Sequence, residues 1–263
     1  MPPSPAFVSI VSRQPLAVVL GTNEIASAIA VRLWRGGRRV VLTHDPLPPV
    51  LRRGMAFHDA LWGEDAEVDG MRAIAVDGLL PLLAATAHTV AITRMGLADL
   101  LPLGRFDVLV DARLRKYAAT PDLRPFASST IGLGPGFTAG LDCDVAIETR
   151  PDRLGVLLTR GSTAAPDGSP PPLGGHGEDR FVRAGEPGVW RTPFPIGARV
   201  YRGQVVGRLD RTAVTAPMDG ILRGLVRDGT EVPDGSKLIE IDPRNRRQAR
   251  WTGLDERGRT VAA

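Results

Sequence analysis

The turn Gly21-Thr-Asn-Glu-Ile-Ala26 has the residue types and the position of a phosphate-binding turn. It directly follows the apolar run Leu16–Leu20 and opens a stretch with helical spacing, so its backbone amides could meet a pyrophosphate. Asp45 follows the next apolar run, where a carboxylate could bind a ribose hydroxyl. However, Asn23 replaces the middle glycine that lets a pyrophosphate approach the backbone. The pattern fits either a nucleotide site or a tight turn without a ligand, and the candidate ligand residues are Gly21, Thr22, Asn23 and Asp45.

A second candidate is the glycine-rich stretch Ile131-Gly-Leu-Gly-Pro-Gly-Phe-Thr-Ala-Gly140. Closely spaced glycines let amides point at an anion or let a ligand approach the backbone, and a threonine hydroxyl adds a donor. The alternative is a glycine-rich turn that serves packing alone. The candidate ligand residues here are Gly132, Gly134, Gly136 and Thr138.

Charged residues lie at the ends of two other apolar runs. Asp111, Arg113 and Lys116 lie at or after the end of the run 106–111, and Glu148 and Thr149 end the run 145–149. Open parallel sheets bind ligands at the carboxyl ends of their strands, so Arg113 and Lys116 could neutralise a phosphate. A solvated loop would explain the same charges. We assign all five residues to the predicted ligand site and leave the catalytic residues unassigned.

Other kinds of catalysis find little support. The four histidines, His44, His58, His88 and His176, lack metal-ligand spacing, so we expect no metal site. Cys143 is the only cysteine, and the two aspartates beside it disfavour a thiolate, so we expect an unreactive cysteine. The sequence contains neither a nucleophile elbow nor a phosphate-binding loop that ends in Lys-Ser or Lys-Thr.

The elements that must position these residues read as strands alternating with helices. Apolar runs at 16–20, 40–43, 73–76, 89–93, 106–111 and 145–149 predict buried strands. Ile25, Ile29 and Leu33 share one face of a helix that should end at Gly36-Gly37. This order predicts an α/β fold, with a Rossmann-like doubly wound ligand-binding domain over residues 12–162.

The second half of the chain contains a repeat. A Pro/Gly-rich linker at 163–182 separates it from the first half. A shift of 32 positions then pairs Gly188 with Gly220 and Val200 with Val232, as in a duplicated unit. The stretch Ala216-Pro-Met-Asp-Gly220 resembles biotinyl and lipoyl carrier domains. We expect a small all-β barrel-sandwich hybrid domain of this kind over 183–244, followed by an Arg-rich tail at 245–263.

The carrier lysine of those domains is missing. Asp210-Arg211-Thr212 occupies its place in the hairpin, and Lys237 falls in a strand-entry position. Because the modification needs an exposed amine at the hairpin tip, we expect no covalent biotin or lipoate. The domain is therefore interpreted as a structural or partner-docking module.

Composition narrows the partners and the location. The 263 residues carry a formal net charge of +4, and the basic residues are spread along most of the chain, so we expect no nucleic-acid partner. Apolar runs are too short for a signal-peptide core or a membrane span, so we expect no membrane association. One cysteine fits a reducing compartment, and we expect a cytoplasmic protein of undetermined oligomeric state.

Four segments together resemble one bacterial and archaeal family of accessory proteins, named for the selenium-dependent molybdenum hydroxylase system. The resemblance spans about residues 16–244 and implies a cytosolic accessory or maturation role for a molybdenum-dependent client enzyme, through handling of its cofactor. The segments are the Gly21 turn with Glu24 and Ala26, the stretch 131–140, Ile147-Glu-Thr149 with Leu154-Gly155, and Arg223-Gly-Leu225 leading to Ile241-Asp-Pro-Arg244.

Three functions are compatible with the sequence. The first is an accessory protein that binds a nucleotide-like or pterin-like, phosphate-bearing ligand in its first domain and a partner through its second. The second is an NAD(P)-dependent oxidoreductase. The third is a non-catalytic scaffold in one-carbon or purine metabolism. The sequence leaves open whether the protein is an enzyme.

Overall fold

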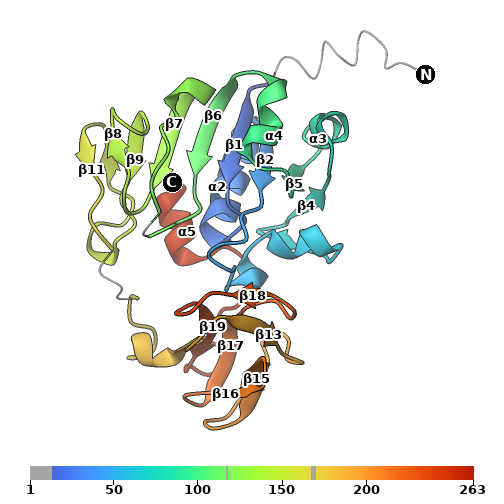
Figure 1. Ribbon diagram of the computed structural model, residues 1–263, viewed down its shortest axis with the longest axis vertical. Coiled ribbons are helices and arrows are strands. Elements are labelled where there is room, and N and C mark those ends of the chain that lie inside the picture. Colours follow the sequence, from blue (N-terminus) through green and yellow to red (C-terminus); the bar gives the residue numbers. More distant parts are fainter. Residues whose placement is uncertain (1–13, 117, 167–169) are drawn as a thin grey trace. The chain divides into compact units, whose positions relative to one another are not determined.

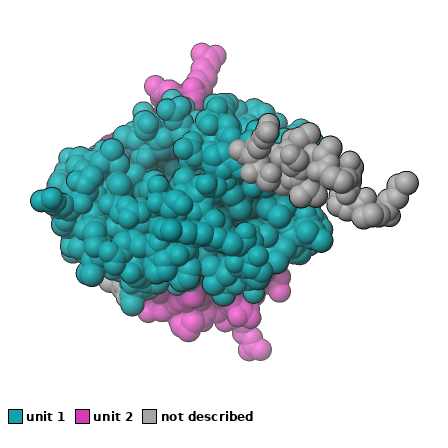
Figure 2. Space-filling view, turned by 90° about the horizontal axis from the view of Figure 1, so that it is seen from above, with its two compact units in different colours: residues 1–45, 56–166, 254–263 teal, residues 46–55, 167–253 magenta. Residues whose placement is uncertain are grey.

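The computed structural model describes residues 14–116, 118–166 and 170–263. The chain divides into two compact units, drawn in different colours in Figure 2. Unit 1 contains residues 1–45, 56–166 and 254–263, and unit 2 contains residues 46–55 and 167–253. Each unit is therefore assembled from segments that are distant in the sequence.

A mixed nine-stranded sheet forms the centre of unit 1 (Figure 1). Its strand order is β10-β9-β7-β6-β1-β2-β5-β4-β3, and only the edge pairs β10–β9 and β4–β3 are antiparallel. The carboxyl ends of the parallel strands therefore share one edge. The strands are β1 (Leu16–Leu20), β2 (Arg39–Thr43), β3 (Glu67–Val68), β4 (Met71–Ala75), β5 (Val90–Thr93), β6 (Phe106–Asp111), β7 (Ala127–Leu133), β9 (Val145–Ile147) and β10 (Leu157–Leu158).

Short elements connect these strands. A separate two-stranded antiparallel sheet pairs β8 (Thr138–Ala139) with β11 (Gly161–Ser162). The α-helices of the described residues are α2 (Glu24–Arg35), α3 (Leu79–Ala85), α4 (Leu97–Leu100) and α5 (Glu256–Val261). Single 3-10 turns add η2 (His58–Trp62), η3 (Leu101–Leu103), η4 (Arg124–Phe126) and η5 (Pro151–Arg153) in this unit.

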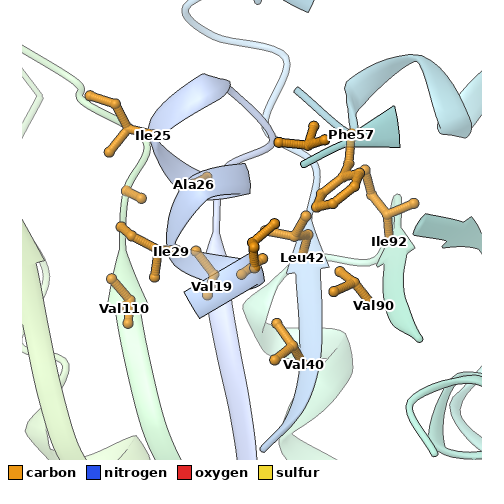
Figure 3. Packing of buried hydrophobic residues seen from close by; sticks show 14 of the residues in the cluster. Val19, Ile25, Ala26, Ile29, Val40, Leu42, Phe57, Val90, Ile92 and Val110 are labelled. Carbon is orange, nitrogen blue, oxygen red and sulfur yellow. The ribbon is translucent and has the colours of Figure 1, made fainter. Parts of the chain in front are cut away.

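Strand β1 shows why the core of unit 1 forms here. All five of its residues are buried. Successive side chains of a strand point to opposite faces, so these residues contribute to the core on both sides of the sheet. Val19 packs with Ile25 and Ile29 of α2, as Figure 3 shows. Val18 packs on the other side with Leu82 of α3 and residues of neighbouring strands. The apolar run thus supports a core on each face.

Helix α5 lies beside α2 in the same unit. A Cβ added to Gly258 would come within 3.0 Å of the Ala28 Cβ and 3.1 Å of the Glu24 carbonyl oxygen, so glycine permits this close approach. Val261 joins the buried cluster under α2. The segment at 254–263 is therefore part of unit 1.

Unit 2 is built from two four-stranded sheets, β12-β19-β17-β14 and β16-β15-β13-β18, in which all pairs are antiparallel. Trp190 is fully buried in their shared core, and its Nε1 donates a 3.1 Å hydrogen bond to the Val226 carbonyl oxygen. The elements are η1 (Arg53–Met55), η6 (Glu178–Arg180), β12 (Phe181–Arg183), β13 (Gly188–Arg191), β14 (Arg199–Val200), β15 (Val205–Leu209), β16 (Thr212–Thr215), β17 (Gly220–Leu225), β18 (Glu231–Val232) and β19 (Lys237–Asp242).

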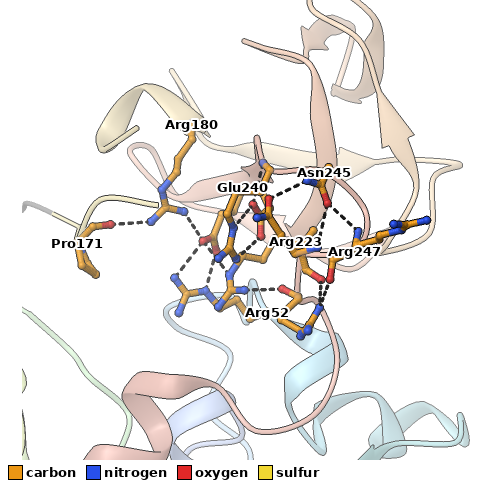
Figure 4. Close-up of polar contacts among 12 residues, drawn as sticks. Arg52, Pro171, Arg180, Arg223, Glu240, Asn245 and Arg247 are labelled. Carbon is orange, nitrogen blue, oxygen red and sulfur yellow. Dashed lines mark hydrogen bonds and ion pairs between the residues drawn. The ribbon is translucent and has the colours of Figure 1, made fainter. Parts of the chain in front are cut away.

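The carboxylate of Glu240, on β19, lies at the centre of a buried polar cluster in unit 2 (Figure 4). Arg52 Nε and Arg223 Nε approach its oxygens at 2.7 Å and 3.3 Å, and Arg180 Nη1 also bonds it. Arg180 Nη2 in addition donates to the Pro171 carbonyl oxygen at 3.1 Å. Segments 46–55 and 170–180 are thereby tied to the sheet.

The expected fold class, a Rossmann-like doubly wound sheet followed by a biotinyl- or lipoyl-like barrel-sandwich hybrid domain, is wrong. The large sheet is mixed, and three further sheets are antiparallel. The described part of the connection from β6 to β7 holds only the three-residue turn η4, and that from β7 to β9 holds β8, where the expected fold requires helices. Apolar runs indicate which segments are buried, but they do not specify what connects them.

The division of the chain also differs from the expected one at three places. Residues 46–55 lie inside the predicted first domain, 12–162, but belong to unit 2. The predicted linker, 163–182, is shared between the units and contains η6 and the start of β12. The predicted Arg-rich tail, 245–263, divides into a part in unit 2 and a part, with α5, in unit 1.

Candidate functional site

The Gly21 turn lies at the carboxyl end of β1, against the loop after β6. Gly21 has a φ of 111°, and a Cβ there would lie 3.1 Å from the Ala112 carbonyl oxygen. Asn23 Nδ2 donates to the same oxygen at 2.7 Å. Glycine at position 21 is thus explained by the close approach of two loops.

Asn23 also caps α2. Its Oδ1 accepts from the backbone N–H groups of Ile25 and Ala26 at 2.9 and 3.0 Å. These are amides that a helix start would otherwise offer to an anion. A pyrophosphate at this turn would have to compete with a side chain of the protein itself.

The glycine-rich stretch is folded closely onto its own side chains. A Cβ on Gly132 would lie 2.2 Å from ring atoms of Phe137, and one on Gly134 would lie 3.0 Å from Thr149 Oγ1 and 3.2 Å from Leu114. Leu114 belongs to the loop after β6, so this contact shows that the glycine-rich stretch and that loop are neighbours. The three predicted turns therefore converge, but Asn23 and Leu114 occupy space between them.

The remaining predicted residues of this region bond within the protein. Glu148 is fully buried, and its carboxylate accepts from the amides of Thr149, Arg150 and Ala164 at 2.7 to 3.0 Å. Gly136 O accepts from Thr120 Oγ1 at 3.2 Å, and Thr138 Oγ1 shares a 2.8 Å hydrogen bond with Ser162 Oγ. These contacts fix the loop, and ligand binding by these residues stays a prediction.

The predicted charged residues meet at the carboxyl ends of β2 and β6. Arg113 Nε lies 2.9 Å from Asp111 Oδ1, and Arg113 Nη1 lies 3.6 Å from Asp45 Oδ2. Arg115 forms a further ion pair with Asp45, and Lys116 is exposed in the same loop. Burial opposes the charge on Arg113, but Asp111 and Asp45 outweigh it and raise the pKa of that guanidinium. Residues from two strand ends thus form one ion-pair network.

An aromatic group lies beside this network. Thr22 Oγ1 and His58 Nδ1 share a buried 2.8 Å hydrogen bond, and the rings of His58 and Trp62 are 4.8 Å apart. The ring of His44, the residue before Asp45, lies 5.3 Å from that of His58 and 6.0 Å from that of Trp62. The loops after β1 and β2 and the turn η2 therefore meet here.

The surroundings of the His44 ring disfavour its protonated form. Burial lowers the pKa of His44, and Arg94 lowers it further, while Asp45 acts in the opposite direction. Its Nδ1 is buried and has no hydrogen-bond partner among the described residues. The Arg94 guanidinium itself lies 5.3 Å from the centre of the Trp62 ring.

Sequence reasoning missed this aromatic group and Arg115. The spacing of the histidines does not reveal their role, because that role depends on contacts between loops that follow different strands. A signal was present, since a tryptophan lies four residues after His58, which places both on one face of a helical turn. Within the described residues, no set of three or more His, Cys, Asp or Glu side chains is arranged to hold a metal ion.

Cavities of about 410 Å³ and 420 Å³ lie elsewhere. The first lies between β12 and β16 of unit 2, and the second lies beside α2 and the C-terminal residues of unit 1. The candidate site is thus defined by its polar and aromatic side chains and not by either cavity. None of the helices in the described part of the chain has the length and apolar character that a membrane crossing needs.

The comparison with curated proteins gives a relative that is similar in sequence over most of this chain. The chain is 32% identical over 265 residues to the uncharacterized protein YqeB of Escherichia coli strain K12. The match covers 95% of this chain but only 46% of that protein, so the chain spans about half the length of its relative. No family model matches the chain.

Solved structures give only distant likenesses. The product-bound ectoine utilization protein EutE (DoeB) of Ruegeria pomeroyi is 11% identical, with a TM-score of 0.28 over 88% of this chain and 86% of that one. A succinylglutamate desuccinylase/aspartoacylase of Rhodobacter sphaeroides is 10% identical, with a TM-score of 0.27 over 87% and 85% of the two chains. Likenesses at this level carry no argument about activity.

The comparisons add no support to the function expected from the sequence. The curated relative is uncharacterized, and the names of the similar structures do not mention molybdenum, so these comparisons do not support a role in molybdenum enzyme maturation. The resemblance to the accessory-protein family was not tested by them and stays a prediction.

Proposed function

We propose that unit 1 binds a phosphate-bearing ligand with a flat, nucleotide-like or pterin-like ring at the carboxyl ends of β1, β2, β5 and β6. The observation that supports this most is the continuous set of contacts from Trp62 through His44 and Asp45 to Arg113 and Arg115. It places cationic and aromatic groups side by side at the sheet edge where open parallel sheets bind ligands.

The cationic part suits a phosphate. The Arg115 side chain is 40% exposed, whereas those of Arg113 and Asp45 are 17% and 10% exposed. A phosphate arriving from solvent therefore meets Arg115 first. A planar guanidinium can hold a carboxylate and a phosphate oxygen at the same time through its several N–H groups. Asp45 would orient the guanidinium while the ligand binds its outer edge.

The aromatic part suits a flat ring. Trp62 is 42% exposed, which gives a ligand access to an indole ring at this edge. Buried polar atoms without a partner are rare in native proteins, so His44 Nδ1 is a place where a ligand atom could complete a hydrogen bond. A neutral imidazole can offer either a donor or an acceptor, depending on its tautomer.

Calorimetry on the full chain tests the two parts separately. The probes are pyrophosphate, ADP and neopterin, titrated into the protein and into Arg115→Gln and Trp62→Leu. We expect Arg115→Gln to weaken ADP and pyrophosphate about tenfold, the effect of one charged hydrogen bond, and to leave neopterin unchanged. Trp62→Leu should weaken ADP and neopterin and leave pyrophosphate unchanged.

A matched control is available in the same unit. Arg124 is 38% exposed and pairs with Asp122, as Arg115 is 40% exposed and pairs with Asp45, but Arg124 lies in η4. Arg124→Gln should bind all three probes like the parent protein. If none of the probes binds, or if Arg124→Gln weakens binding as much as Arg115→Gln, the proposal is wrong.

The other hypotheses stay predictions with tests of their own. An NAD(P)-dependent oxidoreductase should bind NADH or NADPH, and more tightly after Asn23→Gly frees the amides of Ile25 and Ala26. A non-catalytic scaffold in one-carbon or purine metabolism should bind none of these compounds. The cytoplasmic location also stays a proposal, which cell fractionation tests.

A further inference from the structure

Edge strands of unit 2 differ in how well they are protected against pairing with another chain. Proteins protect such edges with short strands, charges, prolines or register irregularities. β14 and β18 have two residues each and begin with Arg199 and Glu231. β12 contains the charged residue Arg183. Each of these three edges is therefore protected.

β16 has none of these protections. Its four residues, Thr212-Ala-Val-Thr215, include neither a charge nor a proline and are rich in β-branched side chains. β16 pairs with β15 alone and ends its sheet. The shift in the register of that pair falls between Val205 and Gly207 of β15, so β16 itself runs straight. Such an edge is suited to accept another strand.

The open cavity of about 410 Å³ runs along this edge. All four residues of β16 line it, and Val182 and Arg183 of β12 lie on its other side. Leu209 and Leu238 add apolar surface. The cavity is therefore a groove between two edge strands, with room beside β16 and apolar side chains to receive those of an added strand.

The charge of unit 2 indicates the occupant. Unit 2 carries 16 Lys and Arg against 11 Asp and Glu, a formal net charge of +5, whereas unit 1 carries 17 against 18. Arg211 is exposed directly before β16. Across the groove, Arg183 is exposed and pairs with Glu178, and Glu186 also lines the groove. A second copy of the chain would bring the same positive charge to the edge. A partner segment with acidic side chains would be attracted to it.

We propose that this groove binds an extended, acidic peptide segment of a partner protein by strand addition to β16. Main-chain hydrogen bonds to β16 provide affinity, and alternate side chains of the segment point to the apolar lining. The acidic side chains between them face outward, toward Arg183 and Arg211. This site lies within unit 2 and does not depend on the ligand proposed for unit 1.

The experiment uses the full chain and a labelled synthetic peptide of about eight residues, a usual strand length, in which valine alternates with glutamate. We expect saturable binding by fluorescence anisotropy and slower hydrogen exchange at the amides of residues 212–215. A peptide with lysine in place of glutamate should bind at least tenfold more weakly. Replacing the two central valines with proline should abolish binding, because proline cannot donate a main-chain hydrogen bond.

Variants separate strand addition from general charge attraction. Ala213→Asp places a negative charge on the edge itself, and Thr252→Asp places the same charge on an exposed loop of unit 2. Ala213→Asp should weaken the glutamate peptide at least tenfold, and Thr252→Asp should not. Thr215→Asp repeats the test if Ala213→Asp fails to fold by circular dichroism.

Three results would overturn the proposal. One is equal binding of the proline-containing peptide, and another is equal weakening by Thr252→Asp. The third is a dimer of the chain, formed without peptide, that protects residues 212–215, because the occupant would then be a second copy.

Discussion

The side-chain amide nitrogen of Asn23 donates a 2.7 Å hydrogen bond to the carbonyl oxygen of Ala112. This bond joins the loop after β1 to the loop after β6, while the Oδ1 atom of the same side chain caps α2. Asparagine can do both because its amide group carries a donor and an acceptor.

Replacing Asn23 therefore has graded effects. Asn23→Ala removes the cap and the loop contact, and we expect it to lower the free energy of unfolding by about 1–2 kcal/mol. Asn23→Ser keeps an oxygen that can cap α2 but loses the amide nitrogen that donates to Ala112, so we expect a smaller decrease in the free energy of unfolding. Urea denaturation followed by far-UV circular dichroism measures both, with Asn245→Ala as the control for an exposed asparagine turn in unit 2. Equal losses for alanine and serine would show that the cap contributes nothing.

Gly132 and the Phe137 ring are packed so closely that a methyl group does not fit. Gly132→Ala would place a Cβ 2.2 Å from the ring, and we expect a loss of about 1–3 kcal/mol from overpacking. Phe137→Leu in the same chain should restore part of the loss. Gly185→Ala is the matched control, because Gly185 is not among the glycines with positive φ and an added Cβ has open space. Similar unfolding curves for the two alanine variants would contradict this prediction.

Two strands and the contact of Gly132 show what the sequence could and could not predict. The runs at 16–20 and 106–111 are confirmed as β1 and β6, because continuous apolar residues report burial on both faces. The contact of Gly132 with Phe137 was not predictable, because a glycine that packs on a ring and one that admits a ligand leave the same pattern. The predicted fold class was wrong for a related reason. It requires helices in the connections after β6, and the sequence of those connections has no strong helical period.

Predicting the candidate site required the order of the strands. Asp45 and Arg113 are far apart in the sequence, and they meet because β1 pairs with both β2 and β6. The strand ends could be predicted from composition, so both residues were found. Trp62 was missed because η2 has no apolar period that ties it to the sheet edge, and the role of His44 was missed because it depends on the rings of η2.

Cys143 should be unreactive in the folded protein. Burial raises the pKa of its thiol to about 11, and Asp142 and Asp144 act in the same direction, against a weaker opposing effect of a backbone hydrogen bond from Gly132. Since the thiolate is the reactive form, we expect labelling by DTNB at pH 8 to be at least about one hundred times slower than for an exposed cysteine. The same protein in guanidinium chloride should label within the mixing period. Rapid labelling of a sample with native circular dichroism would contradict this.

Glu240 is a fully buried carboxylate with which Arg52, Arg180 and Arg223 all form ion pairs. Glu240→Gln leaves three buried guanidiniums without its charge, so we expect a loss of about 3–5 kcal/mol in the free energy of unfolding. Glu231→Gln, an exposed change on β18, should cost little.

Acid should reduce the difference between the parent protein and Glu240→Gln. Burial opposes ionisation of Glu240, but Arg52, Arg223 and Arg180 outweigh it and lower its pKa from 4.5 to about 2. The folded state therefore holds this carboxylate charged at pH values where the unfolded chain binds a proton. The stabilisation is complete above pH 4.5 and falls by about 1.4 kcal/mol per pH unit as the pH decreases toward 2. Urea denaturation of both proteins between pH 7 and pH 3 measures this, and a difference that grows in acid would refute the assignment.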